Sequence, residues 1–240
     1  MANTELLFLK DAYAKECDSK VIILAEGGIV LDKTVFYYTS GGQPNDVGKI
    51  IRGKDGKEFT VKEVRKINGE VIHLLDSLEG WTLGDELKGE INWERRYKLM
   101  RTHTAGHVLS AIMHKRGGIL ITGNQLGIEH ARFDFSMENF DRSFIDSCVE
   151  EANDECKKGH GVEVFTLPKE EAMKIPGIVK LAGALPPNLL ELRIVKIGEL
   201  DIQADGGTHV RNTKEVGEIE FEKAENKGAV NRRIYFKLKE

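Results

Sequence analysis

The sequence has 240 residues, of which 40% are hydrophobic and 31% charged, and its formal net charge is −4. This balance is typical of a globular protein of one large or two modest domains. The apolar runs are too short to span a membrane, and the weakly acidic charge argues against a nonspecific, strongly basic nucleic-acid binder. We therefore expect neither a membrane partner nor DNA, and nothing in the sequence indicates an oligomeric state.

The cysteines and the first residues favour a cytoplasmic location. Cys17, Cys148 and Cys156 are scattered along the chain and form neither a disulfide framework nor a CxxC pair. The opening MANTELLFLKDAY lacks the basic n-region of a signal peptide.

Residues 1–95 are rich in short β patterns. Two apolar runs flank Gly27 and Gly28 and predict a hairpin. Further strands are predicted at 47–52, 58–67, 70–76 and in the alternating segment 80–96, with turns at 54–57 and 68–70. Because the turn signals come at barrel-like spacing, we expect a small β-barrel.

Residues 96–240 mix helical and strand patterns. Residues 97–118 have apolar side chains at helical spacing and end at two glycines. The remaining expected elements are a strand pair in 119–135, a long amphipathic helix in 138–161, strands at 162–167 and 189–198, a short helix at 169–175 and a closing hairpin in 217–240. The apolar stripe of the long helix is expected to hold Phe140, Phe144, Cys148 and Ala152. The predicted fold class is therefore α+β, with a barrel domain (1–95) followed by an α+β domain (96–240).

The segment HTAGH places His103 and His107 one helical turn apart on the same face. This spacing lets two imidazoles bind one metal ion, although such a pair is also common among ordinary surface residues. The segment lacks the HExxH pattern of metalloproteases, because no general base lies between the two histidines. The pair is therefore a candidate half-site of another kind.

A second candidate half-site is ADGGTH, in which Gly206 and Gly207 let the chain turn so that Asp205 and His209 converge. Together with the two helical histidines these residues make a plausible tetrahedral zinc set. Without a thiolate the site is expected to hold zinc less tightly and to tolerate other divalent ions. Two alternatives remain: Asp205 caps its own turn and a water completes a three-histidine shell, or no metal binds.

Several motifs together resemble a known family. RTHTAGHVL, RFDF, the helix that contains Asn153, GGTHVRNTKEVG and GAVNRRI resemble, in this order, the editing domain of alanyl-tRNA synthetases. The segment Phe36–Gly48 resembles the glycine-rich motif of the β-barrel that precedes that domain. A barrel followed by an editing domain looks like the free-standing alanyl-tRNA editing proteins of the AlaX family, medium form.

The resemblance implies a hydrolase that deacylates tRNA(Ala) mischarged with serine, and with glycine. It implies one zinc ion bound by His103, His107 and His209, with Asp205 at the usual place of a cysteine. Zinc would either activate a water or orient the substrate's amino group. The aminoacylation core is missing from the resemblance, so we expect no charging of tRNA. The alternatives are an inactive tRNA-binding module and a metal-dependent hydrolase of other esters.

Residues for the substrate are expected near the metal. Thr122 and Asn124 are candidates for binding the hydroxyl of serine, with Thr122 favoured. The other predicted substrate contacts are Gly206, Gly207 and Thr208. Arg132 and Asp134 share one face of a strand and are expected to form an ion pair that supports the fold.

Residues for tRNA are expected in two places. Gly41, Gly42 and Gln43 would form a close-approach loop whose Gln43 amide faces the acceptor end or the editing cleft, although a structural β-turn is the alternative. In the basic run Glu94–Arg101, the expected phosphate contacts are Arg95, Arg96 and Arg101. The alternative for these arginines is a solvated surface.

Overall fold

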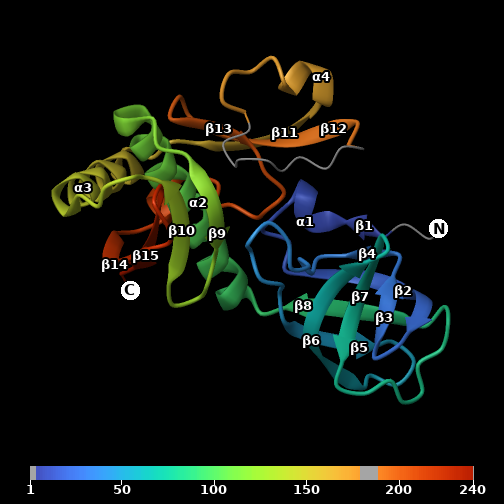
Figure 1. Cartoon of the computed structure of the whole chain (residues 1–240). Coiled ribbons are helices and arrows are strands. Elements are labelled where there is room, and N and C mark those ends of the chain that lie inside the picture. Colours follow the sequence, from blue (N-terminus) through green and yellow to red (C-terminus); the bar gives the residue numbers. More distant parts are fainter. Residues whose placement is uncertain (1–3, 179–188, 240) are drawn as a thin grey trace. The chain divides into compact units, whose positions relative to one another are not determined.

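The computed structural model describes residues 4–178 and 189–239 (Figure 1). The chain divides into two compact units, Met1–Lys98 and Leu99–Glu240. The division falls inside helix α2 (Trp93–Gly117), three residues after the boundary expected at 95/96. Among the described residues, none of the helices has both the length and the apolar character needed to cross a membrane.

The first unit is built around a closed barrel of six strands in the order β2-β3-β7-β6-β5-β8, so the small barrel expected from the sequence is present (Figure 1). All neighbouring barrel strands are antiparallel. The barrel strands are β2 (Glu16–Ala25), β3 (Gly28–Leu31), β5 (Gly48–Arg52), β6 (Glu58–Ile67), β7 (Glu70–Leu75) and β8 (Glu86–Ile91). Outside it lie β1 (Glu5–Leu6), α1 (Leu7–Lys10) and β4 (Lys33–Thr34), with β1 and β4 paired in parallel.

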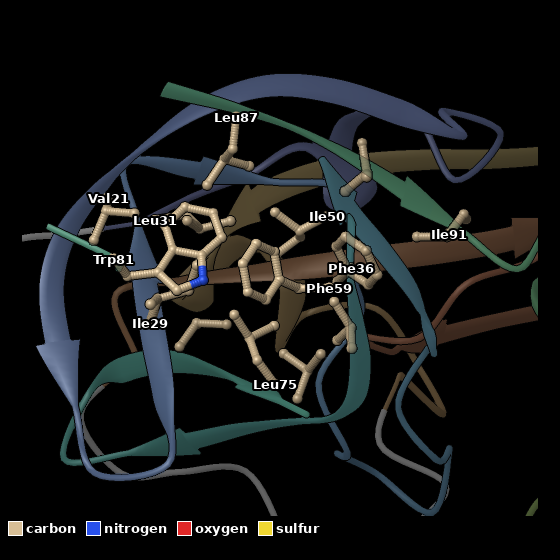
Figure 2. Packing of buried hydrophobic residues seen from close by; sticks show 14 residues of the cluster. Val21, Ile29, Leu31, Phe36, Ile50, Phe59, Leu75, Trp81, Leu87 and Ile91 are labelled. Carbon is tan, nitrogen blue, oxygen red and sulfur yellow. The ribbon is translucent and has the colours of Figure 1, made fainter. Parts of the chain in front are cut away.

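The barrel interior is filled by alternate residues of its strands, as the period of two requires. Figure 2 shows aliphatic side chains packed around Phe36, Phe59 and Trp81. The rings of Phe59 and Trp81 lie 4.9 Å apart. Gly48 is required where β5 crosses β8, since a Cβ there would lie 2.1 Å from the carbonyl oxygen of Glu90.

One barrel residue is a buried histidine. His73 is fully buried on β7, and its Nε2 lies 2.8 Å from the hydroxyl of Thr34. Burial lowers the pKa of His73 to about 4, because the imidazolium form would lose its hydration. His73 is therefore neutral at physiological pH.

The second unit contains two antiparallel sheets. The four-stranded sheet has the order β14-β15-β10-β9 and the three-stranded sheet the order β11-β12-β13 (Figure 1). The strands are β9 (Ile121–Gln125), β10 (Ala131–Ser136), β11 (Val162–Pro168), β12 (Glu191–Ile197), β13 (Asp201–Ala204), β14 (Ile219–Asn226) and β15 (Asn231–Leu238). The helices besides α2 are α3 (Arg142–Lys158), α4 (Lys169–Ala172) and the 3-10 turn η1 (Thr213–Glu215). The expected closing hairpin is β14–β15.

Helix α2 begins earlier than the sequence predicts. The side chain of Asn92 accepts a hydrogen bond from the Arg95 amide at 3.0 Å, which satisfies one of the free N–H groups of the first turn. The helix therefore starts at Trp93, and the strand predicted to continue to residue 96 ends at Ile91.

Helix α3 has a well-defined start. The Asp141 carboxylate accepts a hydrogen bond from the Phe144 amide at 3.1 Å. Phe140 precedes this cap and is 48% exposed, so its expected place on the buried stripe is wrong. The stripe that is buried consists of Ile145, Cys148, Val149, Ala152 and Cys156. Asn153 fastens α3 to β14, since its side-chain amide bonds both the N–H and the carbonyl of Ile219 at 2.7 and 2.9 Å.

Candidate metal centre

Four side chains of the second unit converge on one point. His103 and His107 come from α2, while Asp205 and His209 come from the turn that follows β13. Their potential ligand atoms all lie within 4.8 Å of one another. We call these four residues the donor cluster. The two half-sites identified separately in the sequence are therefore one site in the fold.

The position of α2 depends on Gly106, which lies between the two helical histidines. A Cβ at this position would lie 2.2 Å from Cζ of Phe133 on β10. Only a glycine allows the helix to pack this closely on the four-stranded sheet. The sequence HTAGH thus contains two candidate ligands and also Gly106, which allows their helix to pack closely on the sheet.

The carboxylate of Asp205 has a different contact for each oxygen. Its Oδ1 accepts a hydrogen bond from the Gly207 amide at 2.7 Å and lies 2.9 Å from Nε2 of His209. Its Oδ2 lies 3.6 Å from Nε2 of His103. Asp205 therefore caps its own turn and also faces the histidines, so the two roles considered from the sequence are compatible.

The orientation of His209 is set by Thr104. The Thr104 hydroxyl donates to the carbonyl of Met100 at 3.0 Å, so its oxygen can accept from Nδ1 of His209, 3.2 Å away. With the proton on Nδ1, the Nε2 lone pair of His209 faces the Asp205 carboxylate. Two acceptors that face each other at hydrogen-bond distance are stabilised by a cation between them.

The electrostatics of the donor cluster favour the forms that bind metal. Burial holds the pKa of His103 well below its ordinary value and lowers the pKa of His209 to about 4. Burial would raise the pKa of Asp205, but its attraction to His103 and the contact with His209 hold that pKa well below the ordinary value. Two neutral imidazoles and an ionised carboxylate are the states required of metal ligands.

The dimensions also suit a small divalent ion. Zinc–ligand bonds of about 2.0–2.2 Å place the atoms of a tetrahedral set roughly 3.3–3.6 Å apart. The cluster's spread of at most 4.8 Å contracts to that size with small side-chain movements. The donor set of three imidazoles and one carboxylate lacks thiolate, so it does not restrict the ion to a soft metal.

Two further residues of the site were given no role in the sequence analysis. Thr104 is fully buried and contacts His209, as described above. The buried Asp201 on β13 lies with Oδ2 at 3.0 Å from Nδ1 of His107. In the sequence, Asp201, Gln203 and Asp205 alternate, which was the available signal that they share one face of a strand.

Comparisons with known proteins agree with both units. The family model of class II (A) tRNA synthetases matches residues 2–95, and that of the threonyl and alanyl tRNA synthetase second additional domain matches residues 192–235. The chain is 44% identical over 237 residues to the alanyl-tRNA editing protein AlaX-M of Saccharolobus solfataricus, covering 98% of this chain and 99% of that protein. The chain belongs to the AlaX-M family.

Other relatives support this assignment. The AlaX-M protein of Methanosarcina mazei is 42% identical over 242 residues, which covers 98% of this chain and 96% of that protein. The alanine–tRNA ligase of Methanococcus maripaludis is 36% identical over 228 residues, which covers 94% of this chain but 25% of the ligase. The chain thus corresponds to about a quarter of that longer protein.

The two predicted hydroxyl-binding residues lie on opposite faces of β9. Asn124 pairs with Phe133, so it shares the face of the sheet that packs on α2. Thr122 is exposed and donates to Asn231 at 2.9 Å on the other face, next to a register shift at Asp134/Phe135. Asn124, and not the preferred Thr122, therefore shares the sheet face that packs on α2.

The three predicted substrate contacts beside Asp205 differ in exposure. Gly206 is exposed and has open space around it, whereas Gly207 is buried with its amide bonded to Asp205. Thr208 is fully buried. Gly206 is the one of the three that is open to a ligand.

The predicted phosphate contact Arg96 is corrected by the structure. Its guanidinium is fully buried in the first unit, where it pairs with Asp46 and donates to the carbonyls of Ala12 and Val35. It is a structural group and is not available to RNA. Arg95 and Arg101 are half-buried and donate to the carbonyls of Asn45 and Val216, respectively.

The glycine-rich motif of the first unit forms a tight turn. Ser40 and Gln43 are bridged, and the two residues between them have positive φ angles, Gly41 of 57° and Gly42 of 83°. Gln43 is fully buried, which favours the alternative of a structural turn. Gly41 is exposed and has open space around it.

The expected ion pair between Arg132 and Asp134 is also corrected. Asp134 is bound by Arg233 of β15 through two hydrogen bonds of 2.6 and 2.8 Å. Arg132 instead donates to Gln125 at 2.8 Å. The pairing partner comes from the neighbouring strand because Arg233 lies directly opposite Asp134.

Proposed function

We propose that the chain is a trans-editing hydrolase that cleaves the ester of tRNA(Ala) mischarged with serine, and also with glycine. The observation that carries the proposal is the donor cluster, four potential ligands within 4.8 Å in a chain of the AlaX-M family. A hydrolytic centre of this kind belongs to an aminoacyl-tRNA deacylase. The resemblance over nearly the whole chain favours this over an unrelated ester hydrolase.

The need for such an enzyme follows from size discrimination. A pocket for alanine admits the smaller glycine and rejects serine poorly, because one added hydroxyl changes binding by a small free energy. A second site that hydrolyses the wrong product provides the missing selectivity. A hydrogen-bonding group that recognises serine's hydroxyl would let this site spare alanine.

The donor cluster would hold one zinc ion through Nε2 of His103, His107 and His209 and through Oδ2 of Asp205. A divalent ion bound here would supply a Lewis acid for hydrolysis of the ester. The chain's own contribution is to keep the imidazoles of His103 and His209 neutral by burial and to hold the Asp205 turn closed through the Gly207 amide.

Asn124 is the proposed partner of the serine hydroxyl. It shares the sheet face that packs on α2, and its amide can both donate and accept hydrogen bonds. Gly206 provides an open approach beside Asp205, where the ester of a small amino acid can lie.

For tRNA we retain Arg95, Arg101, Gly41 and Gly42 as proposed contacts. The two arginines keep one guanidinium nitrogen on a carbonyl, and each has further N–H groups with which to bind phosphate. The open space at Gly41 would let an RNA backbone approach the turn closely.

The decisive experiment measures deacylation of tRNA(Ala) charged with serine, glycine or alanine. We expect rapid release of serine, release of glycine and little release of alanine. Asn124→Ala should reduce the rate for serine more than the rate for glycine, whereas Thr122→Ala serves as the matched control and should change neither.

The alternatives predict different results. A tRNA-binding module without activity would bind tRNA(Ala) but release no amino acid above the spontaneous rate. A hydrolase of other esters would cleave small model esters and ignore the tRNA. Either result would overturn the proposed function.

A further inference from the structure

Asp201 is a buried carboxylate whose place beside the donor cluster is not explained by the fold alone. Its side chain is fully buried, and its Oδ2 lies 3.0 Å from Nδ1 of His107. The same oxygen accepts a hydrogen bond from the Gln203 side chain at 2.8 Å. A carboxylate removed from water loses several kcal/mol of hydration, so its contacts must offset a large penalty.

We propose that Asp201 is a positioning residue that fixes the tautomer and the orientation of His107 for metal binding. The proposal rests on the proposed function, in which His107 is a ligand. A carboxylate can only accept, so the Nδ1 atom of His107 carries the proton and donates it to Asp201. The lone pair of His107 is then on Nε2, which faces the donor cluster.

The imidazole of His107 on α2 and that of His209 in the turn after β13 are thereby oriented by different groups. His209 is oriented by the neutral hydroxyl of Thr104, at 3.2 Å. His107 is oriented by a charged group, which makes the imidazole a stronger donor to a cation. With Asp205 as a ligand, Asp201 brings a second negative charge to the surroundings of a doubly charged ion.

Gln203 holds Asp201 in place. Both residues lie on β13 with their side chains on the same buried face, two positions apart. Gln203 pairs with Val195 of β12, so the register of the two strands fixes the positions of Asp201 and Gln203 along the sheet. The carboxylate is thus held before any ion binds, which is what a positioning residue requires.

Asp201 also borders a pocket of about 320 Å³, whose wall includes His114, Gly198 and Ile202. Removal of the Asp201 side chain would leave an empty space next to Nδ1 of His107. A small carboxylate such as formate could then take the place of the missing group. This offers a test by chemical rescue.

The test compares Asp201→Ala and Asp201→Asn with the unchanged protein, using the full chain and zinc or cobalt(II) alone as the probe. The matched control is Asp134→Ala, which removes a carboxylate of the same unit that binds Arg233. Competition with a chromophoric chelator should show that zinc binds about 10–100-fold more weakly to Asp201→Ala. Asp201→Asn should lie in between, since it keeps an acceptor but not the charge, and the control should be unchanged.

Two readouts separate positioning from a structural role. In the metal-free protein, the ¹⁵N shifts of the His107 ring should show a protonated Nδ1, and this signature should be lost in Asp201→Ala. Formate should restore part of the metal affinity of Asp201→Ala and leave that of the other proteins unchanged. The proposal is overturned if Asp201→Ala binds zinc more weakly, formate does not restore the affinity and the His107 tautomer is unchanged. The loss of zinc affinity would then come from a structural change.

A further variant distinguishes this proposal from the proposed function. If His107→Ala binds zinc as well as the unchanged protein, His107 is not a ligand and the proposed metal centre itself fails. If His107→Ala loses zinc while Asp201→Ala keeps the full affinity, the metal centre stands and the role of Asp201 is refuted.

Discussion

Arg96 and Asp46 form a fully buried ion pair inside the first unit. Nε of Arg96 lies 3.0 Å from each carboxylate oxygen, and the Tyr37 amide donates to the same carboxylate at 2.7 Å. Nη2 also donates to Asp46 and to the carbonyl of Val35, and Nη1 donates to the carbonyl of Ala12. Such a pair specifies where the start of α2 packs.

Breaking this pair should destabilise the barrel unit. Arg96→Met leaves the Asp46 charge buried without its partner, so we expect a loss of about 3–5 kcal/mol in the free energy of unfolding. Both tryptophans, Trp81 and Trp93, lie in this unit, so their fluorescence in urea reports its unfolding. The neighbouring, half-buried Arg95→Met is the control and should lose far less. Equal losses would contradict a special role of the pair.

Neutralising Arg95 should weaken tRNA binding without loss of bound metal. If Arg95 contacts one phosphate, Arg95→Gln should lower the slope of log affinity against log salt by roughly 0.7–0.9. Fluorescence titration with tRNA(Ala) at several salt concentrations measures the slope. Arg65→Gln is the matched control, since Arg65 is an exposed barrel arginine paired with Glu63. The proposed contact is wrong if the slope of Arg95→Gln equals that of the unchanged protein.

Adding one methyl group to α2 should disturb the donor cluster. The Cβ of Gly106→Ala would overlap Phe133, so the helix or the ring must move, at an expected loss of roughly 1–3 kcal/mol. The double variant Gly106→Ala/Phe133→Leu should recover part of the loss in thermal unfolding. Gly161→Ala, where a Cβ has open space, is the control and should be close to neutral. Full stability of Gly106→Ala would show that the packing is looser than the structure has it.

Acid should weaken the barrel through His73. Its pKa is about 4 in the folded chain and about 6.5 when unfolded, so the unfolded chain binds the extra proton between these values. The stabilisation is fully present above pH 6.5 and is lost as the pH falls towards 4, with roughly 2 kcal/mol lost by pH 5. Comparing His73→Gln with the unchanged protein isolates the contribution of His73 to the pH dependence of the unfolding free energy. Parallel pH profiles of unfolding free energy for the two would contradict the shift.

Changing Asp205 should separate its two contacts. Asp205→Cys should raise the affinity for zinc, because a thiolate is the softer donor, while the metal-free protein loses about 1 kcal/mol with the Gly207 hydrogen bond. Asp205→Asn should keep the turn but bind zinc more weakly. Zinc competition and thermal unfolding without metal measure the two effects. Unchanged zinc affinity in both variants would place Asp205 outside the ligand set.

Patterns that are local in the sequence predicted the fold well. The turn-separated strands of the first unit form a barrel, and the closing hairpin is present, because residue alternation and turn chemistry act over a few neighbours. HTAGH and DGGTH were each predicted to be half of a site, and the structure brings them together. The start of α2 was missed, although Asn92 is an ordinary capping residue.

Contacts between distant residues could not be predicted from the sequence. Arg96 and Asp46 are 50 residues apart, and nothing local shows that Arg96 is buried with a partner and is not on the surface. A register shift in the β9–β10 pair decides which way Thr122 points, and single residues carry no signal for it. Asp201 has the same difficulty, since its partner His107 lies 94 residues earlier.

The long stretch of sequence between α2 and β13 sets the order in which the donor cluster forms during synthesis. His103 and His107 leave the ribosome long before β13, so an early ion would find only two imidazoles on a nascent helix. Two ligands bind an ion weakly, and the full set forms only when a chain segment of about a hundred residues has closed on itself. Ion capture would thus come late and would hold two distant parts of the second unit together. Slow unfolding of the loaded protein, rather than fast folding, is the expected benefit.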